Sequence, residues 1–305
     1  MSLPSGEGRH SFKDRIRTAF SRPNRSEEPA GDFSCHDLGS LQETLLLPLW
    51  GRAVEARKPN PRLVDATAVH VMATIDYDFS TIARNIRFIT QLAWISRSLH
   101  VDRTISAFLA RYPEGAVVNL GCGLDTTFDR VDNGSVRWYD LDLPDVIDLR
   151  SSYIPERERS TVLPFNIFDT AWSQRIDTSG EILFVASGLF YYFEERQVRT
   201  FLTELAQTFP GAELIFDACS PVGLRVANRK VIRAGGMDSS ALLKWSVRNV
   251  RDLEKWDRHT TVVAEYPVFH GVKSGFTLKE KLGTSLSDAL RAMFMVHLRF
   301  APPAR

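Results

Sequence analysis

The sequence predicts an α/β protein built on a doubly wound, mostly parallel sheet of seven strands. After residue 116, apolar segments of strand length alternate with segments of helical periodicity, which is the pattern of consecutive β–α–β units. The clearest unit covers residues 117–131, where a short apolar strand enters a glycine turn before a helix start. The last two predicted strands, 262–268 and 294–300, are expected to pair antiparallel at the end of the chain.

The glycine turn predicts a site for a ligand that contains adenosine. Gly121 and Gly123 let ligand atoms approach the backbone, and the following helix start presents free N–H groups. The next strand closes on Asp142, 21 residues after Gly121, and an acid at about that spacing accepts hydrogen bonds from ribose hydroxyls. The alternative is that Asp142 only caps a helix, because a Leu-Pro pair follows it. Thr126 occupies the third glycine position, so the full dinucleotide motif is absent.

Two motifs resemble a known family. The segments NLGCGLDTTF at 119–128 and DLDLP at 140–144 are similar to the leucine carboxyl methyltransferase family, and most of all to its bacterial branch of polyketide O-methyltransferases, of the tetracenomycin carboxyl methyltransferase type. The likeness extends from about Leu41 to the C-terminus. The resemblance implies a class I methyltransferase fold and S-adenosylmethionine (SAM) as the cofactor.

The resemblance assigns one arginine to the cofactor. The family has an arginine ahead of its first strand that binds the carboxylate of SAM's methionine part, and Arg97 stands at that place. A planar guanidinium donates two parallel hydrogen bonds to a carboxylate, which a lysine does not reproduce. If Arg97 is only a solvated helix arginine, then Arg52, Arg84 and Arg87 are the alternative cations.

Three further cofactor positions follow from the resemblance, and they depart from the family pattern. In the family an acid and a leucine after the third strand hold the adenine, and this chain has Asn166 and Ile167 there. The amide oxygen of Asn166 still accepts a hydrogen bond, and Asp169 is the alternative acceptor in another register. Ser187 ends the fourth strand where the family usually has a glutamate. The predicted cofactor site is therefore Arg97, Gly121, Gly123, Asp142, Asn166, Ile167 and Ser187.

The methyl acceptor is expected beyond the same strand ends, because ligands of open α/β sheets bind at the carboxyl ends of the strands. The fourth strand, 182–187, runs into an aromatic segment, GLFYYF. In that segment Tyr191 or Tyr192 is predicted to line the acceptor pocket.

A second group of acceptor residues is predicted in the segment 220–258. This segment has no place in a minimal doubly wound sheet and shows a helical pattern, so it is expected to form an inserted lid. Arg225 or Arg233 would then act as the counter-ion, and Trp245 as a wall, for an anionic planar acceptor.

The predicted organisation is one methyltransferase domain behind a flexible leader. The expected parts are a leader at 1–36 and a domain at 37–305, which divides into a helical cover (37–113), a cofactor-binding core (116–219), the lid (220–258) and the terminal strands (259–305). Two long helices, 82–100 and 102–112, are expected in the cover.

Composition excludes several classes of function. The chain has 305 residues with 38 basic and 37 acidic side chains, and this formal charge of +1 gives no electrostatic case for nucleic acid. It contains no apolar run of about 18 residues, so no membrane span is expected and a cytoplasmic location is predicted. Its three cysteines lack metal or redox spacing, and the scattered histidines predict no metal site and no assignable catalytic residue. The sequence leaves the oligomeric state open.

The predicted function is SAM-dependent O-methylation of a small-molecule carboxylate or phenolic hydroxyl in secondary metabolism of the polyketide type. One alternative is a dinucleotide-dependent oxidoreductase, which Thr126 at the third glycine position disfavours. Another is a SAM-binding protein without turnover, which the replacement of family acids by Asn166 and Ser187 would explain.

Overall fold

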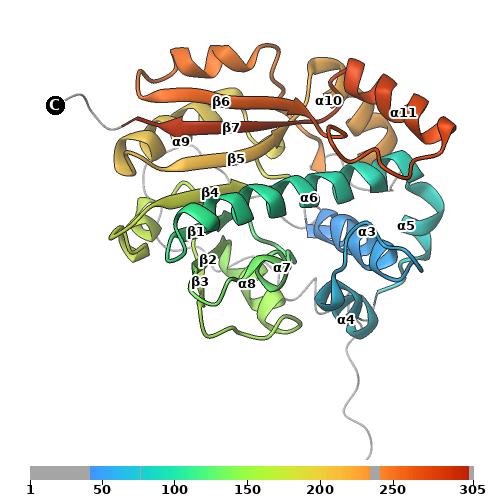
Figure 1. The fold of residues 1–305 in the computed structure, drawn as a ribbon, viewed down its shortest axis with the longest axis horizontal. Helices are drawn as coiled ribbons and strands as arrows, with labels where there is room; N and C mark the ends of the chain where they lie inside the picture. Colours follow the sequence, from blue (N-terminus) through green and yellow to red (C-terminus); the bar gives the residue numbers. More distant parts are fainter. Residues whose placement is uncertain (1–41, 76, 234–240, 302–305) are drawn as a thin grey trace, which may run out of the picture.

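The computed structural model describes residues 42–75, 77–233 and 241–301, so the predicted leader and the segment 234–240 lie outside the described residues. A single sheet of seven strands organises them (Figure 1). The strands are β1 (Ala116–Leu120), β2 (Arg137–Asp142), β3 (Ser160–Pro164), β4 (Ile182–Ala186), β5 (Glu213–Ala218), β6 (Thr260–Pro267) and β7 (Phe294–Phe300).

The strand order confirms the predicted doubly wound topology. The order is β3-β2-β1-β4-β5-β7-β6, and the five strands from β3 to β5 are parallel. The strand β7 runs antiparallel to both β5 and β6, so the last two strands pair as the sequence predicted. The chain winds outward from β1 in one direction and from β4 in the other, and ligands of such sheets bind at this switch point.

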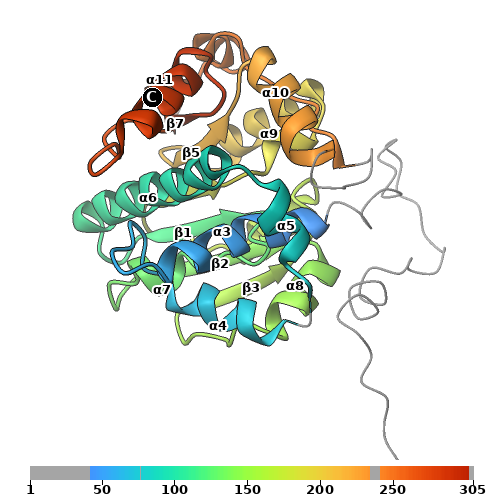
Figure 2. The same cartoon turned by 90° about the vertical axis from the view of Figure 1, so that its right-hand side faces the viewer.

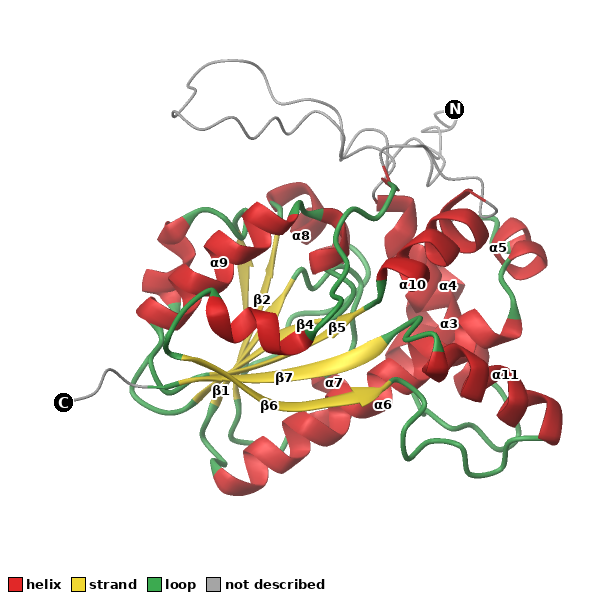
Figure 3. Ribbon diagram, turned by 90° about the horizontal axis from the view of Figure 1, so that it is seen from above, coloured by secondary structure: helices red, strands yellow, loops and turns green. Residues whose placement is uncertain are grey.

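Helices cover both faces of the sheet, and the side chains of β1 point alternately to one face and the other. Val117 faces one side and packs with apolar residues of α6 (Phe88–Arg111) and α7 (Phe128–Val131). Val118 faces the other side and packs with apolar residues of α9 (Glu195–Thr208). Figure 3 shows α6 and α9 on opposite faces of the sheet. All five residues of β1 are buried, as expected for a central parallel strand.

The helices that precede β1 pack beside the carboxyl ends of the strands, and the last of them, α6, continues from there along one face of the sheet. They are η1 (Gln42–Leu45), α3 (Leu46–Ala56), α4 (Ala66–Thr74), α5 (Ser80–Asn85) and α6. The predicted helix break after His100 is wrong, because α6 is continuous. The segment from Phe88 to Arg111 contains no glycine or proline to end a helix. The break lies instead at Ile86 and Arg87, where the backbone is extended.

The segments between β5 and β7 close the other side of the same end of the sheet. They include α10 (Pro221–Ala227), the π-helical η4 (Asn228–Arg233) and α11 (Leu278–Ala289), whereas the 3₁₀ helix η6 (Val250–Lys255) packs against the start of β6 at the opposite end of the sheet. Figure 2 shows α10 and α11 on one side of α6, with α3 and α4 on the other. The helix α11 was not among the predicted elements. The remaining short helices are α8 (Pro144–Ser151), η2 (Thr170–Arg175) and η3 (Phe190–Tyr192). Over the described ranges, none of the helices has the length and apolar character that crossing a membrane requires.

Candidate active site

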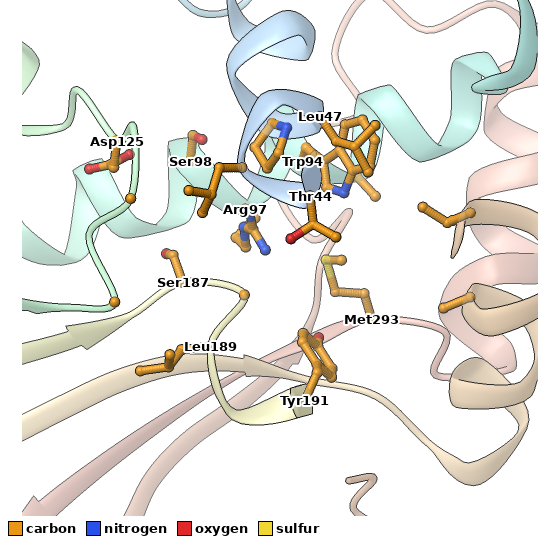
Figure 4. A pocket seen from close by; sticks show the side chains of 18 of the residues that line it. Thr44, Leu47, Trp94, Arg97, Ser98, Asp125, Ser187, Leu189, Tyr191 and Met293 are labelled. Carbon is orange, nitrogen blue, oxygen red and sulfur yellow. The ribbon is translucent and has the colours of Figure 1, made fainter. Parts of the chain in front are cut away.

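A cavity of about 320 Å³ lies at the carboxyl ends of β1, β2, β4 and β5. Its lining includes the glycine turn after β1, the end of β2 and the segment 187–189 after β4. Residues of η1, α3, α6, η3, α10 and η4 also contribute, together with Ala292 and Met293 just before β7. Figure 4 shows side chains from these separate elements converging on one space, among them Thr44, Trp94, Arg97, Tyr191 and Met293. The cavity therefore coincides with the switch point of the sheet, where the sequence places the cofactor.

The glycine turn and Asp142 form one hydrogen-bonded unit. Gly121 and Gly123 have φ values of 65° and 46°, a region that favours glycine. The backbone N–H of Gly123 donates to Oδ2 of Asp142 at 2.8 Å, and that of Leu143 donates to Oδ1 at 2.8 Å. Burial raises the pKa of Asp142 to about 6 in spite of these two donors. All three predicted residues line the cavity.

Two buried arginines donate hydrogen bonds to carbonyl groups of the same turn. Arg150 donates to the carbonyl oxygens of Gly123 at 3.0 Å and Asp125 at 2.5 Å, and Arg52 donates to that of Leu124 at 2.8 Å. Buried acids compensate both charges, since Arg150 pairs with Asp140 and Arg52 pairs with Asp65 at 3.0 Å. The backbone of the turn is therefore fixed before any ligand binds.

The first acid of the DLD motif differs in role from the second. Oδ2 of Asp140 accepts from Arg150 at 2.8 Å, and its Oδ1 accepts from Asn119 at 2.9 Å. Asp140 is buried beneath the turn, whereas Asp142 reaches the cavity. The resemblance therefore rests on two kinds of residue, those that face the cavity and those that support the turn.

Arg97 lies in the cavity wall, where the resemblance placed it. Its Nη1 donates to Oδ2 of Asp217 at 2.9 Å, and the residue is only 7% exposed. Burial alone would lower the pKa of Arg97, but the charge and hydrogen bond of Asp217 raise it above its ordinary value. Of the alternative cations, Arg52 also lines the cavity, while Arg84 and Arg87 are exposed and lie outside its lining.

Sequence reasoning did not single out Asp217, the penultimate residue of β5. Its carboxylate is 1% exposed and receives three hydrogen bonds, from Arg97, from the N–H of Gly188 at 2.6 Å and from the hydroxyl of Tyr191 at 3.1 Å. The available signal was an acid at the carboxyl end of a buried strand, in the segment LIFDA.

The predicted tyrosines both reach the cavity. Tyr191 is buried and directs its hydroxyl to Asp217, and the Tyr192 hydroxyl donates to Oγ1 of Thr44 at 3.1 Å. Ser187 lines the cavity as well. Many of the other residues that line the cavity are apolar and were not predicted. They include Leu47, Pro48, Ile89, Ala93, Trp94, Val226, Ile232, Leu243 and Met293.

Three acceptor residues predicted in the segment 220–258 lie outside the described lining of the cavity. Trp245 is 3% exposed and belongs to the main core, where its ring stacks on Phe216, so it is not part of the cavity wall. Arg225 and Arg233 are exposed and are absent from the described lining. In the described part of this segment, α10 and η4 turn apolar residues toward the cavity, while both arginines are exposed.

The predicted adenine residues also lie outside the described lining of the cavity. Oδ1 of Asn166 accepts from the N–H of Phe168 at 3.0 Å, which uses it to shape the turn after β3. Ile167 is buried in the main core. Asp169, the alternative acceptor, caps η2 by accepting from the N–H of Ala171. The polar atoms of Asn166 and Asp169 therefore accept hydrogen bonds from nearby backbone, and the adenine assignment stays a prediction.

Sequence comparison decides the family. The family profile "Leucine carboxyl methyltransferase" matches residues 46–206, more than half of the chain. The chain belongs to the leucine carboxyl methyltransferase family. It is 36% identical over 222 residues to the tetracenomycin polyketide synthesis O-methyltransferase TcmP of Streptomyces glaucescens, covering 71% of this chain and 79% of TcmP. It is 29% identical over 272 residues to the S-adenosyl-L-methionine-dependent methyltransferase dpfgK of Gibberella zeae, covering 79% and 90% of the two chains.

Solved structures support the same fold at low identity. A methyltransferase from Thermobifida fusca aligns with a TM-score of 0.53 at 15% identity, over 84% of this chain and 95% of that one. A DUF574 family protein from Streptomyces avermitilis gives 0.54 at 11% identity, over 83% and 97%. These findings confirm the predicted family, the class I methyltransferase fold and the SAM-dependent methyltransferase class of enzyme. The oxidoreductase alternative is set aside.

Proposed function

We propose that this leucine carboxyl methyltransferase family member transfers the methyl group of SAM to a carboxylate oxygen of an apolar small molecule and forms a methyl ester. One observation supports this most. A single cavity joins the glycine turn and Arg97 at one end to an apolar chamber at the other, and its described lining contains no histidine, lysine or glutamate. A carboxylate is already ionised at neutral pH and therefore needs no such base.

The residues at the first end fit SAM. The Asp142 carboxylate would accept hydrogen bonds from the ribose hydroxyls, and the turn at Gly121 and Gly123 lets a ligand lie against the backbone. Among the described residues, Asp217 accepts from Arg97 through Nη1, so the rest of that guanidinium fork is available to the methionine carboxylate. Ser187 lies at the same end of the cavity. Asn166 and Ile167 have no position in this proposal.

The chamber at the second end fits an apolar, planar acceptor. Trp94 forms part of its wall, and the ring lies close to α3, since a Cβ at Gly51 would come within 3.2 Å of Cε3. The hydroxyls of Thr44 and Tyr192 supply polar contacts on another side. An aromatic ring system buries apolar area against such walls, and hydroxyl groups orient its polar substituents.

The transfer places few chemical demands on the protein. SAM supplies an activated methyl group on a sulfonium, which the acceptor oxygen displaces. The chain's own residues hold the two partners in line and exclude water, and a rate gain then comes from positioning. Tyr191 and Arg97 fix the wall between the two ends through their shared partner Asp217.

The relatives support the acceptor class. The bacterial relative is an O-methyltransferase of tetracenomycin polyketide synthesis. We therefore propose that the acceptor belongs to secondary metabolism and resembles a polyketide in being aromatic and carboxylated.

Turnover with labelled SAM tests the proposal. The purified protein should convert methyl-labelled SAM to S-adenosylhomocysteine only when an aromatic carboxylic acid is present. A protein that binds SAM without turnover would bind SAM and S-adenosylhomocysteine in calorimetry. It would form no S-adenosylhomocysteine from SAM with any aromatic carboxylic acid that is tried. The latter result would reject the enzyme proposal.

A further inference from the structure

A buried carboxylate that the proposed methyl transfer does not use directly ties four elements together beside the cavity. Asp217 lies at the carboxyl end of β5 and accepts hydrogen bonds from α6, from the segment after β4 and from η3. Three donors on one buried carboxylate nearly satisfy its accepting capacity. Such a group acts on its neighbours and is not itself presented to a ligand.

The contact with Arg97 is both close and enclosed. The side chains of Arg97 and Asp217 are 9% and 0% exposed, and their 2.9 Å contact joins Nη1 to Oδ2. A charge-assisted hydrogen bond of this kind restrains the position of the guanidinium. Without its acid, the arginine would keep a buried charge with no compensating partner.

Gly188 shows that the surrounding backbone is shaped to this contact. Its φ is +75°, and a Cβ at this position would come within 2.7 Å of Nη1 of Arg97. Its N–H donates to Oδ1 of the same Asp217. The backbone after β4 therefore touches the guanidinium on one side, while the acid holds it on another.

We propose that Asp217 is a positioning residue that aims the guanidinium of Arg97 at the carboxylate of the cofactor. This inference rests on the proposed function, because it takes Arg97 as the partner of that carboxylate. It predicts that removal of the Asp217 charge disturbs recognition of the cofactor's carboxylate and leaves recognition of its ribose intact.

The same strand offers a matched control. Glu213 is the first residue of β5, and Asp217 is the residue before its last. Like Asp217, Glu213 is buried and pairs with arginine, at 2.9 Å to Arg299 and 3.1 Å to Arg111. The parallel strands place Glu213 at the opposite edge of the sheet from the cavity. Loss of its charge should affect stability without affecting recognition of the cofactor.

The test compares two ligands on the full chain by calorimetry. The ligands are S-adenosylhomocysteine and its decarboxylated analogue, which differs only in lacking the carboxylate, and the quantity measured is the ratio of their Kd values. Wild type should prefer the intact ligand. Arg97→Ala and Asp217→Asn should each lower this preference by about tenfold, the scale of a charge-assisted hydrogen bond. Glu213→Gln should leave it unchanged.

The double variant Arg97→Ala/Asp217→Asn separates the possible outcomes and contains no unpaired buried charge. If Asp217 acts through Arg97, the double variant should match Arg97→Ala in both Kd values. A further loss of affinity in the double variant would show that Asp217 affects the ligand by a route other than Arg97 and would overturn the inference. So would an unchanged preference in Asp217→Asn. A wild-type preference that Arg97→Ala leaves unaltered would instead reject the proposed role of Arg97.

Discussion

The backbone N–H of Gly123 donates a 2.8 Å hydrogen bond to Oδ2 of Asp142, which joins the glycine turn to the acid of the next strand. The pair is buried enough that the pKa of Asp142 rises to about 6. The carboxylate proposed to meet the ribose therefore titrates just below neutral pH.

Binding of S-adenosylhomocysteine should weaken as the pH falls through 6. Ribose hydroxyls donate to the charged form of Asp142, so protonation competes with the ligand. The Kd should be constant above about pH 7 and should rise by up to about tenfold per pH unit below about pH 6. Calorimetry from pH 5 to 8 checks this, with Asp142→Asn as a variant whose weaker binding should not vary with pH. A wild-type Kd that stays level throughout would exclude the ribose role.

The contribution of Asp142 to the stability of the free protein should depend on pH in the opposite direction. The folded pKa of Asp142 is raised from 3.8 to about 6. Its contribution to stability is therefore fully present below about pH 4 and is lost as the pH rises through 6. The increase in Tm on adding S-adenosylhomocysteine should accordingly grow between pH 5 and 7 in thermal scans. Asp142→Asn should show no such growth.

Arg150→Ala should lower the free energy of unfolding by about 3–5 kcal/mol, because it leaves Asp140 buried without its cation. It also releases the carbonyl groups of Gly123 and Asp125, so cofactor binding should fall with stability. Urea denaturation measures the first effect. Arg157→Ala is the control, since Arg157 pairs with Asp129 at the surface and should contribute less than about 1 kcal/mol. Equal losses in the two variants would argue against the supporting role of Arg150.

Gly51→Ala should narrow the acceptor chamber. The new Cβ would lie 3.2 Å from Cε3 of Trp94, so the indole must move by a few tenths of an ångström toward the cavity. The KM of a bulky aromatic acceptor should rise while the Kd of S-adenosylhomocysteine stays unchanged, as steady-state kinetics and calorimetry can show. Trp94→Leu in the same background should restore the acceptor KM. A variant that alters only cofactor binding would contradict this placement of Trp94.

Glu213→Gln should lower stability in a pH-dependent way. The hydrogen bond from His297, with help from Arg299 and Arg111, lowers the pKa of Glu213 to about 2. Its contribution is therefore present above about pH 4.5 and is lost as the pH falls toward 2. At pH 7 the variant should lose about 1–2 kcal/mol, a modest value because both arginines are half exposed. In urea titrations at pH 3, the difference in unfolding free energy between the variant and wild type should be smaller than at pH 7. A difference that stays constant would contradict this role of Glu213.

The fold, and the meeting of the glycine turn with Asp142, could be predicted because local patterns determine them. A buried strand, two glycines and an acid on the next strand meet at one sheet edge whatever the rest of the chain does. The family motifs added Arg97, whose place depends on a single long helix. The helix break predicted after His100 is wrong, because no glycine or proline stands there to end a helix.

The acceptor end could not be predicted because distant segments build it. Trp245 resembles a ligand-binding aromatic in sequence, yet its ring stacks on Phe216 in the core. Trp94 gives no local signal that distinguishes a cavity wall from a core residue. Asp217 follows a buried strand, but its partner Arg97 is 120 residues away. Such contacts follow from packing, which a single sequence does not encode at short range.

Methyl transfer to paired aromatic acceptors tests the central claim most directly. One member of each pair carries a free carboxylate and methylated hydroxyls, and the other carries a free phenol and an amide in place of the carboxylate. With saturating methyl-labelled SAM, label should enter the carboxylate member, and mild alkali should then release it as methanol, because methyl esters hydrolyse under these conditions. Label that enters only the phenol member and survives alkali as an aryl methyl ether would contradict the account.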